Sequence, residues 1–263
     1  MRTKLVVGNW KMHFTAAEAG AAVGTFLKHV EAKASVDVVV CPPFPSISRL
    51  RDLVRDSHVK VGAQDVFWEE KGAFTGKVSA RMLYDAGAGF CIVGHSETRG
   101  RFGKTEIPDS TLPYFQETDE TVNLKVKALL FHSINPILCV GETSEERSVG
   151  KTDDVIRAQL FKALEGIEPA ELYFLSVAYE PVWAIGTGDT CDPAEANRVA
   201  GLIRKLLAER LDEDVSQVIR VLYGGSVKSA NAHDLFHQPE IDGGLVGGAS
   251  LDPLEFSRIV MSA

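Results

Sequence analysis

The sequence predicts an α/β protein in which eight strand-and-helix units close into one (β/α)8 barrel domain over residues 1–263. Short runs rich in β-branched residues alternate with helical segments, which indicates repeated βα units and a parallel sheet. Eight runs in 263 residues leave about 33 residues per unit, enough for a strand and its crossover helix. Glycine-rich turns follow the last three runs and not the first, which favours a closed barrel over an open doubly wound sheet.

The expected strands recur along the whole chain with helical segments between them. They cover residues 4–8, 36–41, 59–63, 90–93, 137–140, 172–179, 219–223 and 244–246. Three capping sequences predict helix starts between these strands. Each is an expected capping residue followed three positions later by a reciprocal glutamate: Thr15 with Glu18, Asp192 with Glu195, and Asp252 with Glu255. We interpret these carboxylates as structural and not catalytic.

The segment after Glu195 shows the clearest helical period. Apolar residues up to Leu211 recur at helical spacing, which predicts one stripe packed on the sheet. The charged residues between them are expected to face water: Arg198, Arg204, Lys205 and Glu209.

Composition excludes several classes of protein. The chain is 45% hydrophobic and 24% charged, an ordinary globular composition. With 36 acidic and 28 basic residues the formal net charge is −8, so no basic field favours nucleic acid or an anionic membrane as a partner.

The cysteines and the first residues predict a cytoplasmic location. Four cysteines lie about fifty residues apart without a C-x-x-C pair, so we expect reduced, mostly buried thiols. The beginning of the chain has no apolar run of signal-peptide length, and no segment approaches a membrane span.

Two sequences resemble known motifs but lack residues that those motifs require. The Gly-Lys-Thr sequences at Gly103 and Gly150 lack the glycine that a P-loop needs five positions earlier. His95-Ser-Glu97 resembles part of a zinc deaminase motif, but no P-C-x-x-C follows. We therefore expect neither a metal nor another cofactor.

Polar residues stand where the expected strands end. Asn9 and Lys11 follow the first strand, His95 the fourth and Glu180 the sixth. In a barrel these positions converge on the C-terminal face. A carboxylate base, a neutral imidazole donor and an ammonium group together suit proton transfer next to a carbonyl.

The glycine turns after the last three strands suggest that the substrate carries a phosphate. They are Gly186-Thr-Gly188, Gly224-Gly-Ser226 and Gly247-Gly-Ala-Ser250. Without a Cβ, backbone N–H groups can approach a phosphate dianion closely. A single Gly-Gly pair is equally well explained as a tight turn.

Five motifs together resemble the triosephosphate isomerase family, in order from residue 8 to residue 250. They are Gly8-Asn-Trp-Lys-Met12, Ile92-Val-Gly-His-Ser-Glu97, Tyr179-Glu-Pro-Val-Trp-Ala-Ile-Gly-Thr-Gly188, Tyr223-Gly-Gly-Ser226 and Leu245-Val-Gly-Gly-Ala-Ser250. The resemblance implies a TIM barrel and the interconversion of dihydroxyacetone phosphate and D-glyceraldehyde 3-phosphate through an enediolate, a reaction of glycolysis and gluconeogenesis.

The resemblance also assigns roles to residues. Glu180 is the implied base, His95 the neutral electrophile, Lys11 a source of positive charge, Asn9 an orienting group and Glu97 a supporting carboxylate. The phosphate is implied to rest on Gly186, Gly247 and Gly248 and near Ser226. The segment from Pro181 to Cys191 is the implied lid, with Ile185 and Leu245 as its apolar cover.

The lid's far hinge contains Asp189 and Cys191, so we expect thiol reagents to inhibit through Cys191 if that thiol is exposed. Cys139 matches a family cysteine near the base, and its more ordinary interpretation is a core thiol.

A homodimer is implied through the loop from Gln64 to Lys77, with Thr75 at its tip. Phe67, Trp68 and Phe74 in this loop are equally compatible with local packing. The chain departs from the family by an insertion from Lys104 to Gln116, and by Lys77 and Thr98 at positions whose usual charges pair across the dimer. We expect the insertion to pack against something, because it contains Leu112, Tyr114 and Phe115.

Two alternatives stay open at this point. One is an isomerase of a four-carbon ketose phosphate, against which the short Ile-Gly-Thr-Gly lid argues. The other is a non-catalytic phosphate-binding barrel, against which Lys11, His95 and Glu180 argue. Fold alone would not decide between them.

Overall fold

Eight parallel strands close into a barrel in sequence order in this computed structural model, which describes residues 2–33, 35–103, 106–186 and 190–263. Each strand pairs with its neighbours in the sequence, and β1 also pairs with β8. The strands are β1 (Lys4–Asn9), β2 (Val36–Cys41), β3 (Val59–Ala63), β4 (Phe90–Val93), β5 (Asn135–Val140), β6 (Ser176–Tyr179), β7 (Arg220–Tyr223) and β8 (Gly243–Val246). The predicted fold class is confirmed.

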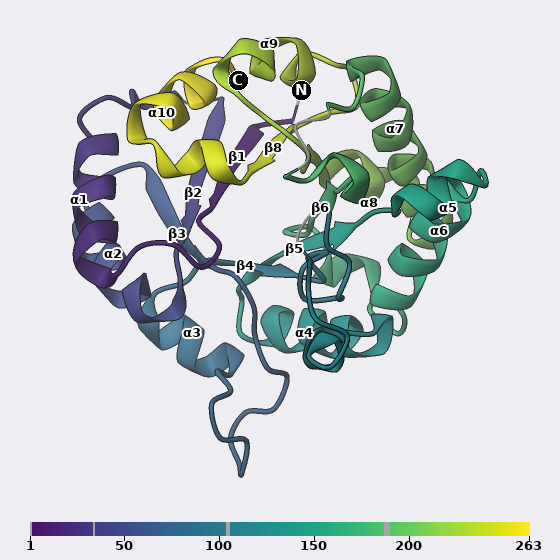
Figure 1. The fold of residues 1–263 in the computed structure, drawn as a ribbon, viewed down its shortest axis with the longest axis horizontal. Helices are drawn as coiled ribbons and strands as arrows, with labels where there is room; N and C mark the ends of the chain where they lie inside the picture. Colours follow the sequence, from purple (N-terminus) through teal and green to yellow (C-terminus); the bar gives the residue numbers. More distant parts are fainter. Residues whose placement is uncertain (1, 34, 104–105, 187–189) are drawn as a thin grey trace.

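Helices surround the barrel in a ring (Figure 1). They are α1 (Ala16–Phe26), α2 (Ile47–Val54), α3 (Ala80–Ala86), α4 (Asp119–Phe131), α5 (Ser144–Ser148), α6 (Thr152–Ala163), α7 (Pro193–Arg210), α8 (Glu213–Val218), α9 (Ser229–Phe236) and α10 (Pro253–Met261). Five short 3-10 helices complete the described elements: η1 (Phe44–Ser46), η2 (Leu112–Phe115), η3 (Pro169–Glu171), η4 (Val182–Ala184) and η5 (Gly248–Leu251).

The predicted sixth strand begins too early. The apolar run starts at Leu172, but β6 begins only at Ser176. Leu172 ends η3, and both Leu172 and Leu175 are buried without strand pairing. A short apolar run shows burial but cannot by itself distinguish a strand from a buried connection.

The three predicted capping residues do cap helices, but only one forms a capping box. Thr15 and Glu18 bond reciprocally at α1. Asp192 and Asp252 accept the first N–H groups of α7 and α10. The glutamates three positions later do not bond back to these capping residues. Glu195 pairs with Arg198, and Glu255 accepts hydrogen bonds from Ser229. The prediction of reciprocal glutamates was therefore wrong at both helices.

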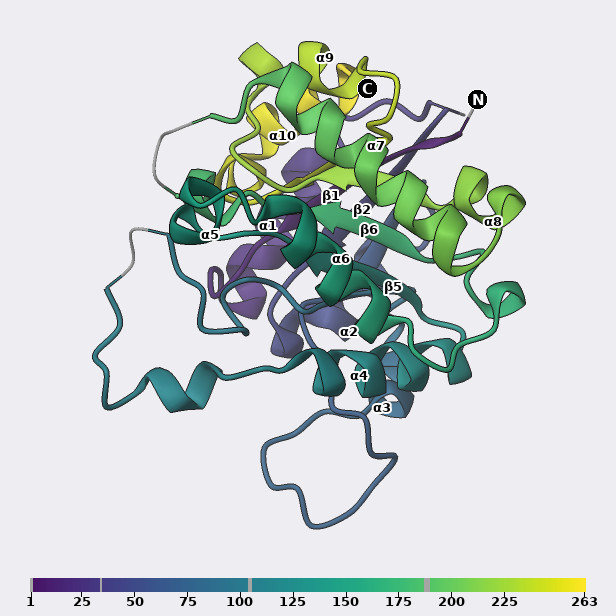
Figure 2. The same ribbon diagram turned by 90° about the vertical axis from the view of Figure 1, so that its right-hand side faces the viewer.

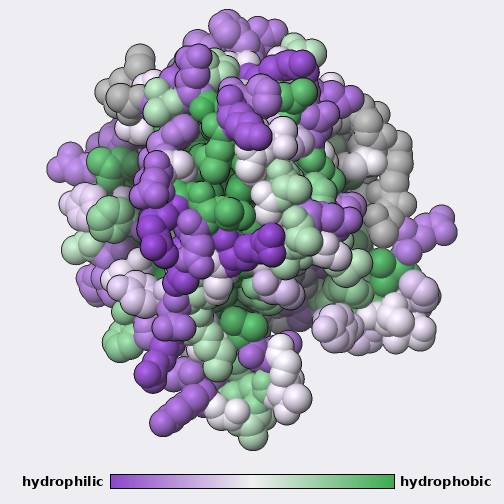
Figure 3. Space-filling model, turned by 90° about the vertical axis from the view of Figure 1, so that its left-hand side faces the viewer, coloured by the Kyte–Doolittle hydropathy of each residue, from purple (hydrophilic) through white to green (hydrophobic). Residues whose placement is uncertain are grey.

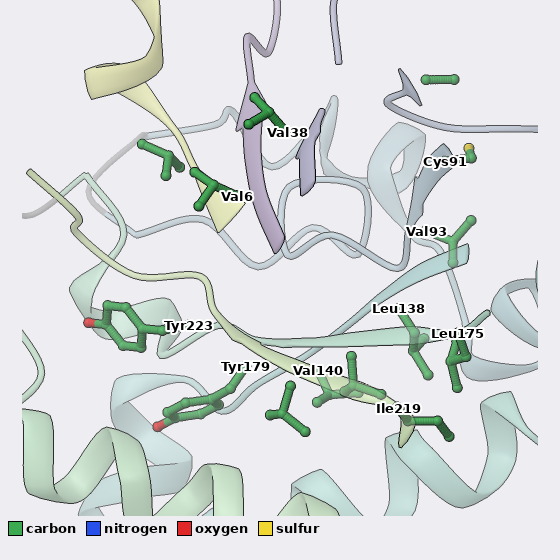
Figure 4. Packing of buried hydrophobic residues seen from close by; sticks show 14 of the residues in the cluster. Val6, Val38, Cys91, Val93, Leu138, Val140, Leu175, Tyr179, Ile219 and Tyr223 are labelled. Atoms are coloured by element: carbon green, nitrogen blue, oxygen red, sulfur yellow. The ribbon is translucent and has the colours of Figure 1, made fainter. Parts of the chain in front are cut away.

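The core has two parts that follow the alternation of the strands. Leu5 and Val7 point into the barrel with other side chains of its interior, while Val6 faces the surrounding helices. Figure 4 shows residues of the outer layer, among them Tyr179 and Tyr223, whose strands pair at that position. The two hydroxyl groups point to the same side in that view, near the carboxyl ends of β6 and β7.

Arg204 contradicts the expectation that it faces water. It is 6% exposed on α7, and its guanidinium donates to Asp242, Glu240 and the carbonyls of Ser216 and Ile219. Helical spacing places a side chain on a face but does not reveal a carboxylate from a distant segment. Arg204 thus joins α7, α8 and the start of β8.

Replacing Arg204 with methionine should lower the free energy of unfolding by about 3 kcal/mol, because it leaves the buried carboxylate of Asp242 with fewer partners. Denaturant unfolding measures the change. Arg157→Met is the control, since it breaks only the exposed pair with Glu209 and should cost less than about 1 kcal/mol. An equal decrease in the free energy of unfolding in the two variants would contradict this account.

Two segments project from the barrel in different directions. Figure 2 shows the loop between β3 and α3 and the segment before α4 extending beyond the ring of helices, and Figure 3 shows a notch between two such projections. The second projection is the insertion, of which Lys104 and Thr105 lie outside the described residues. The insertion does pack, because Phe115 meets the ring of Phe102 at 5.2 Å, although Tyr114 is 84% exposed.

Within the described ranges, none of the helices combines the length and apolar character that crossing a membrane requires.

Candidate active site

A cavity of about 450 Å³ opens at the carboxyl ends of the strands. It brings together eight of the nine predicted site residues. Those that line it are Asn9, Lys11, His95, Glu180, Gly186, Ser226, Gly247 and Gly248. The ninth, Glu97, does not line the cavity but contacts two residues that do.

Glu180 follows β6 and is 1% exposed. Its Oε2 accepts the backbone N–H of Ser96 at 3.0 Å, and its Oε1 lies 3.1 Å from His95 Nε2. Gly224 packs directly against this side chain, because a Cβ there would lie 2.9 Å from Glu180 Cγ. The second glycine turn therefore serves the carboxylate as well as any phosphate.

His95 follows β4 and is 7% exposed. The backbone N–H of Glu97 donates to its Nδ1 at 3.2 Å. A ring nitrogen that accepts a hydrogen bond carries no proton, so a neutral imidazole places its proton on Nε2. That nitrogen lies 3.1 Å from Glu180 Oε1 and, in this tautomer, carries the one ring proton that can be donated.

Lys11 is held in a strained backbone conformation, with φ of 49°. The side chain of Asn9 accepts its N–H at 3.0 Å, and Gln64 donates to its carbonyl at 2.8 Å. Non-glycine residues persist in this region only where the surrounding contacts hold them, and such strain is frequent at functional sites. Gln64 was not predicted as a brace, and no local sequence pattern indicates it.

Glu97 binds the Lys11 ammonium, with Oε1 2.5 Å from Nζ. Burial opposes ionisation of this carboxyl, but neighbouring His95 and Lys11 outweigh it, so the pKa of Glu97 is lowered. The hydrogen bond to His95 Nδ1 indicates a neutral ring, so we ascribe the lowered pKa to Lys11. Glu97 thus acts on the site through Lys11.

Glycines of the turns after the last strands also line the cavity. Gly247 caps the short helix η5, and Gly248 begins it. Ser226, three residues before α9, and Gly186 line the same cavity. Lys228 and Glu255 also line the cavity, although neither was predicted, because Glu255 was interpreted only as a capping residue.

The segment predicted to form the lid begins beside a buried carboxylate. Glu142 accepts from Trp183 Nε1 at 2.9 Å and from Tyr179 Oη at 3.1 Å, and burial raises its pKa despite these bonds. Ile185 and Leu245, the predicted apolar cover, line the cavity. The predicted hinge residue Asp189 and the tip residues Thr187 and Gly188 lie outside the described residues.

All four cysteines have free, buried thiols, as predicted. Cys191 is only 3% exposed, so the condition for inhibition through it is not met. Burial raises its pKa to about 11, and a protonated thiol is a poor nucleophile.

We therefore expect thiol reagents to modify Cys191 slowly in the native chain. Because only the thiolate reacts, the rate should rise about tenfold per pH unit while the pH stays below the pKa of the thiol. Stopped-time titration with a chromogenic disulfide, compared with Cys191→Ala, measures the rate. Rapid loss of one thiol at neutral pH that is absent from Cys191→Ala would contradict it.

Across the described residues, no cluster of three or more His, Cys, Asp or Glu side chains is arranged to hold a metal ion.

Comparison with known proteins decides the family. A model of the family described as "Triosephosphate isomerase" matches residues 4–263. The chain belongs to this family. A triosephosphate isomerase from Dictyoglomus thermophilum is 45% identical over 262 residues, which cover 100% of both chains. One from Moorella thermoacetica is 48% identical, covering 99% of this chain and 98% of the relative, and one from a Roseiflexus species is 47% identical, covering 99% and 97%.

The triosephosphate isomerase match covers every element that carries the site, from β1 to η5. Relatives with this name give no support to either alternative, the four-carbon ketose phosphate isomerase or the non-catalytic barrel. The resemblance carried by the five motifs is confirmed.

Proposed function

We propose that Glu180, His95 and Lys11 carry out the reaction of the family to which the chain belongs, the interconversion of dihydroxyacetone phosphate and D-glyceraldehyde 3-phosphate. The observation that supports it best is the pairing of a buried carboxylate with the protonated nitrogen of a neutral imidazole, 3.1 Å apart. Triosephosphate isomerases are themselves the standard example of such a pair.

In the proposed mechanism Glu180 removes a proton from the carbon next to the carbonyl. The carboxyl proton can exchange with solvent, and Glu180 then donates a proton to the former carbonyl carbon. His95 Nε2–H donates to the substrate oxygens, where negative charge develops. Lys11 offsets the charge of the enediolate, Asn9 helps to orient the substrate, and Glu97 keeps Lys11 in place. Preorganised donors of this kind stabilise a transition state without reorganising during the reaction.

The phosphate is proposed to bind against the glycines that line the cavity. Backbone N–H groups of Gly186, Gly247 and Gly248 would hold its oxygens, with Ser226 nearby. This arrangement fits a small phosphorylated sugar, because the proposed phosphate contacts and the proposed reacting groups line one cavity. No cofactor is needed for the proton transfer.

A coupled assay with purified protein tests the proposed function. We expect turnover of glyceraldehyde 3-phosphate after exhaustive chelation, because the proposed groups are all side chains and backbone N–H groups. A four-carbon ketose phosphate serves as the comparison substrate. A higher kcat/KM for the four-carbon compound, or dependence on an added divalent ion, would contradict the proposal.

We also propose that two copies associate through the loop from Gln64 to Lys77. This loop projects from the barrel (Figure 1), and Phe74 beside its tip is 42% exposed. Its aromatic residues also pack locally, since Phe67 lies 4.1 Å from Trp68 and 4.8 Å from Phe74 between ring centroids. Such packing stiffens the loop, which lowers the entropy lost on association.

The insertion is proposed to supply part of this interface. A groove of about 410 Å³ separates the loop from the insertion, and Phe67, Trp68, Tyr114 and Phe115 are among the residues that line it. Lys77 and Thr98 line it too and cannot form an ion pair with each other. Aromatic contacts would replace that pair and would be less sensitive to salt.

Deleting residues 104–116 should therefore weaken the dimer and lower activity at dilute protein concentration. Sedimentation and dilution assays measure the two effects. A deletion variant that stays as dimeric and as active on dilution as the full chain would show that the insertion is peripheral.

A cytoplasmic location is proposed as well, because four free, buried cysteines suit a reducing compartment.

A further inference from the structure

Thr98 lies between the backbone of His95 and a buried carboxylate. Its N–H donates to the His95 carbonyl at 2.9 Å, and its hydroxyl oxygen lies 2.8 Å from the same carbonyl. The hydroxyl oxygen is also 2.6 Å from Glu117 Oε2. Because the single hydroxyl proton faces two acceptors, Thr98 is restrained from both sides.

Glu117 is itself fixed by several contacts. Its side chain is 5% exposed and forms an ion pair with the ammonium of Lys125. Its backbone N–H donates to the Thr98 carbonyl at 3.1 Å. Two links, one through the backbone and one through side chains, therefore join Thr98 to Glu117.

Lys125 anchors this arrangement to the scaffold. It stands on α4, its side chain is 8% exposed, and its Nζ lies 2.6 Å from Asp65 Oδ1 just after β3. Burial alone would lower the pKa of Lys125, but Asp65 and Glu117 outweigh it and raise the pKa. The ammonium thus stays charged and holds two carboxylates from different segments.

The cluster of Asp65, Glu117 and Lys125 contacts the turn that carries His95 through Thr98; Glu117 and Lys125 are buried, whereas the Asp65 side chain is 39% exposed. With Thr98, its members line the groove beside the insertion and not the catalytic cavity. Residues 95–97 of this turn supply three elements of the site: the His95 ring, the Ser96 N–H that binds Glu180, and the Glu97 N–H that sets the tautomer.

We propose that Thr98 is a positioning residue. Its hydroxyl links the turn of residues 95–97 to Glu117, and this link keeps the His95 ring and the Ser96 N–H in place against Glu180. This inference rests on the proposed function, because it assumes that His95 and Glu180 are the reacting groups. Small displacements of such groups reduce turnover strongly even when substrate still binds.

The test is Thr98→Val, which keeps the branched shape and removes the hydroxyl. We expect kcat to fall about tenfold with KM within about twofold of the wild type. Thr98→Ser restores the hydroxyl and should recover most of kcat. Thr25→Val is the matched control, because it removes a threonine hydroxyl bonded to a backbone carbonyl in the exposed helix α1.

A second measurement separates positioning from stability. The ¹⁵N NMR shifts of His95 Nδ1 and Nε2 report the hydrogen bond from Glu97 N–H and should change in Thr98→Val but not in Thr25→Val. If Thr98→Val does not fold, Glu117→Gln, which keeps the size of the side chain and loses its charge, should change the same signals and lower kcat.

A lower melting temperature with unchanged kcat and unchanged His95 signals would overturn the inference and leave Thr98 a stabilising role only. Absence of isomerase activity in the wild type would instead overturn the proposed function. The NMR comparison would still decide whether Thr98 positions the His95 ring.

Discussion

Replacing Glu180 with glutamine is expected to lower kcat by roughly 10²–10⁴-fold, the usual effect of removing a general base. Glutamine has nearly the same size and can still accept the Ser96 N–H, so the cavity should keep its shape. Binding of a phosphate analogue should therefore persist. Steady-state kinetics gives kcat, and calorimetric titration gives the affinity.

Glu209→Gln is the control for this substitution. Glu209 pairs with Arg157 on the surface, so its loss removes a carboxylate of the same type without touching the cavity. Near-wild-type kcat in Glu180→Gln, with confirmed replacement of the residue, would exclude Glu180 as the base.

Replacing Lys11 with methionine is expected to lower kcat by roughly 10²–10³-fold, the size of effect seen when one preorganised group facing developing charge is removed. Methionine fills a similar volume without charge. The strained backbone, held by Asn9 and Gln64, should keep its place, because both contacts involve main-chain atoms of Lys11. The variant therefore isolates the ammonium group.

Lys228→Met provides the comparison within the same cavity. Lys228 lines the cavity two residues after Ser226, which is proposed to lie near the phosphate, so losing its charge should raise KM more than it lowers kcat. A fall in kcat of the same size in both variants would indicate a general electrostatic effect and would contradict a specific role for Lys11.

The strand ends made most of the site predictable. Asn9, His95 and Glu180 each stand at or just after the carboxyl end of a strand, and a closed barrel gathers such positions on one face. The glycine turns after the last strands were predictable for the same reason. Neither inference needed the tertiary contacts, because topology alone brings these residues together.

The contacts that hold the site in place were not predictable. Ser96 acts through its backbone N–H. Every residue except proline has this group, so the identity of the residue at position 96 does not indicate the contact. Gln64 contacts Lys11 from another segment, Glu117 is proposed to act on the site only through Thr98, and Glu255 seemed fully explained as a capping residue. The prediction that Arg204 faces water was wrong for a similar reason, because helical periodicity cannot show that Asp242 lies opposite it.

Turnover in deuterium oxide tests most directly whether Glu180 moves a proton through the solvent-exchangeable carboxyl group. Dihydroxyacetone phosphate incubated with the wild type should incorporate deuterium at the carbon that loses its proton, and Glu180→Gln should do so roughly 10²–10⁴-fold more slowly. Conversion to glyceraldehyde 3-phosphate without any incorporation of deuterium, or exchange at the wild-type rate in Glu180→Gln, would contradict the mechanism.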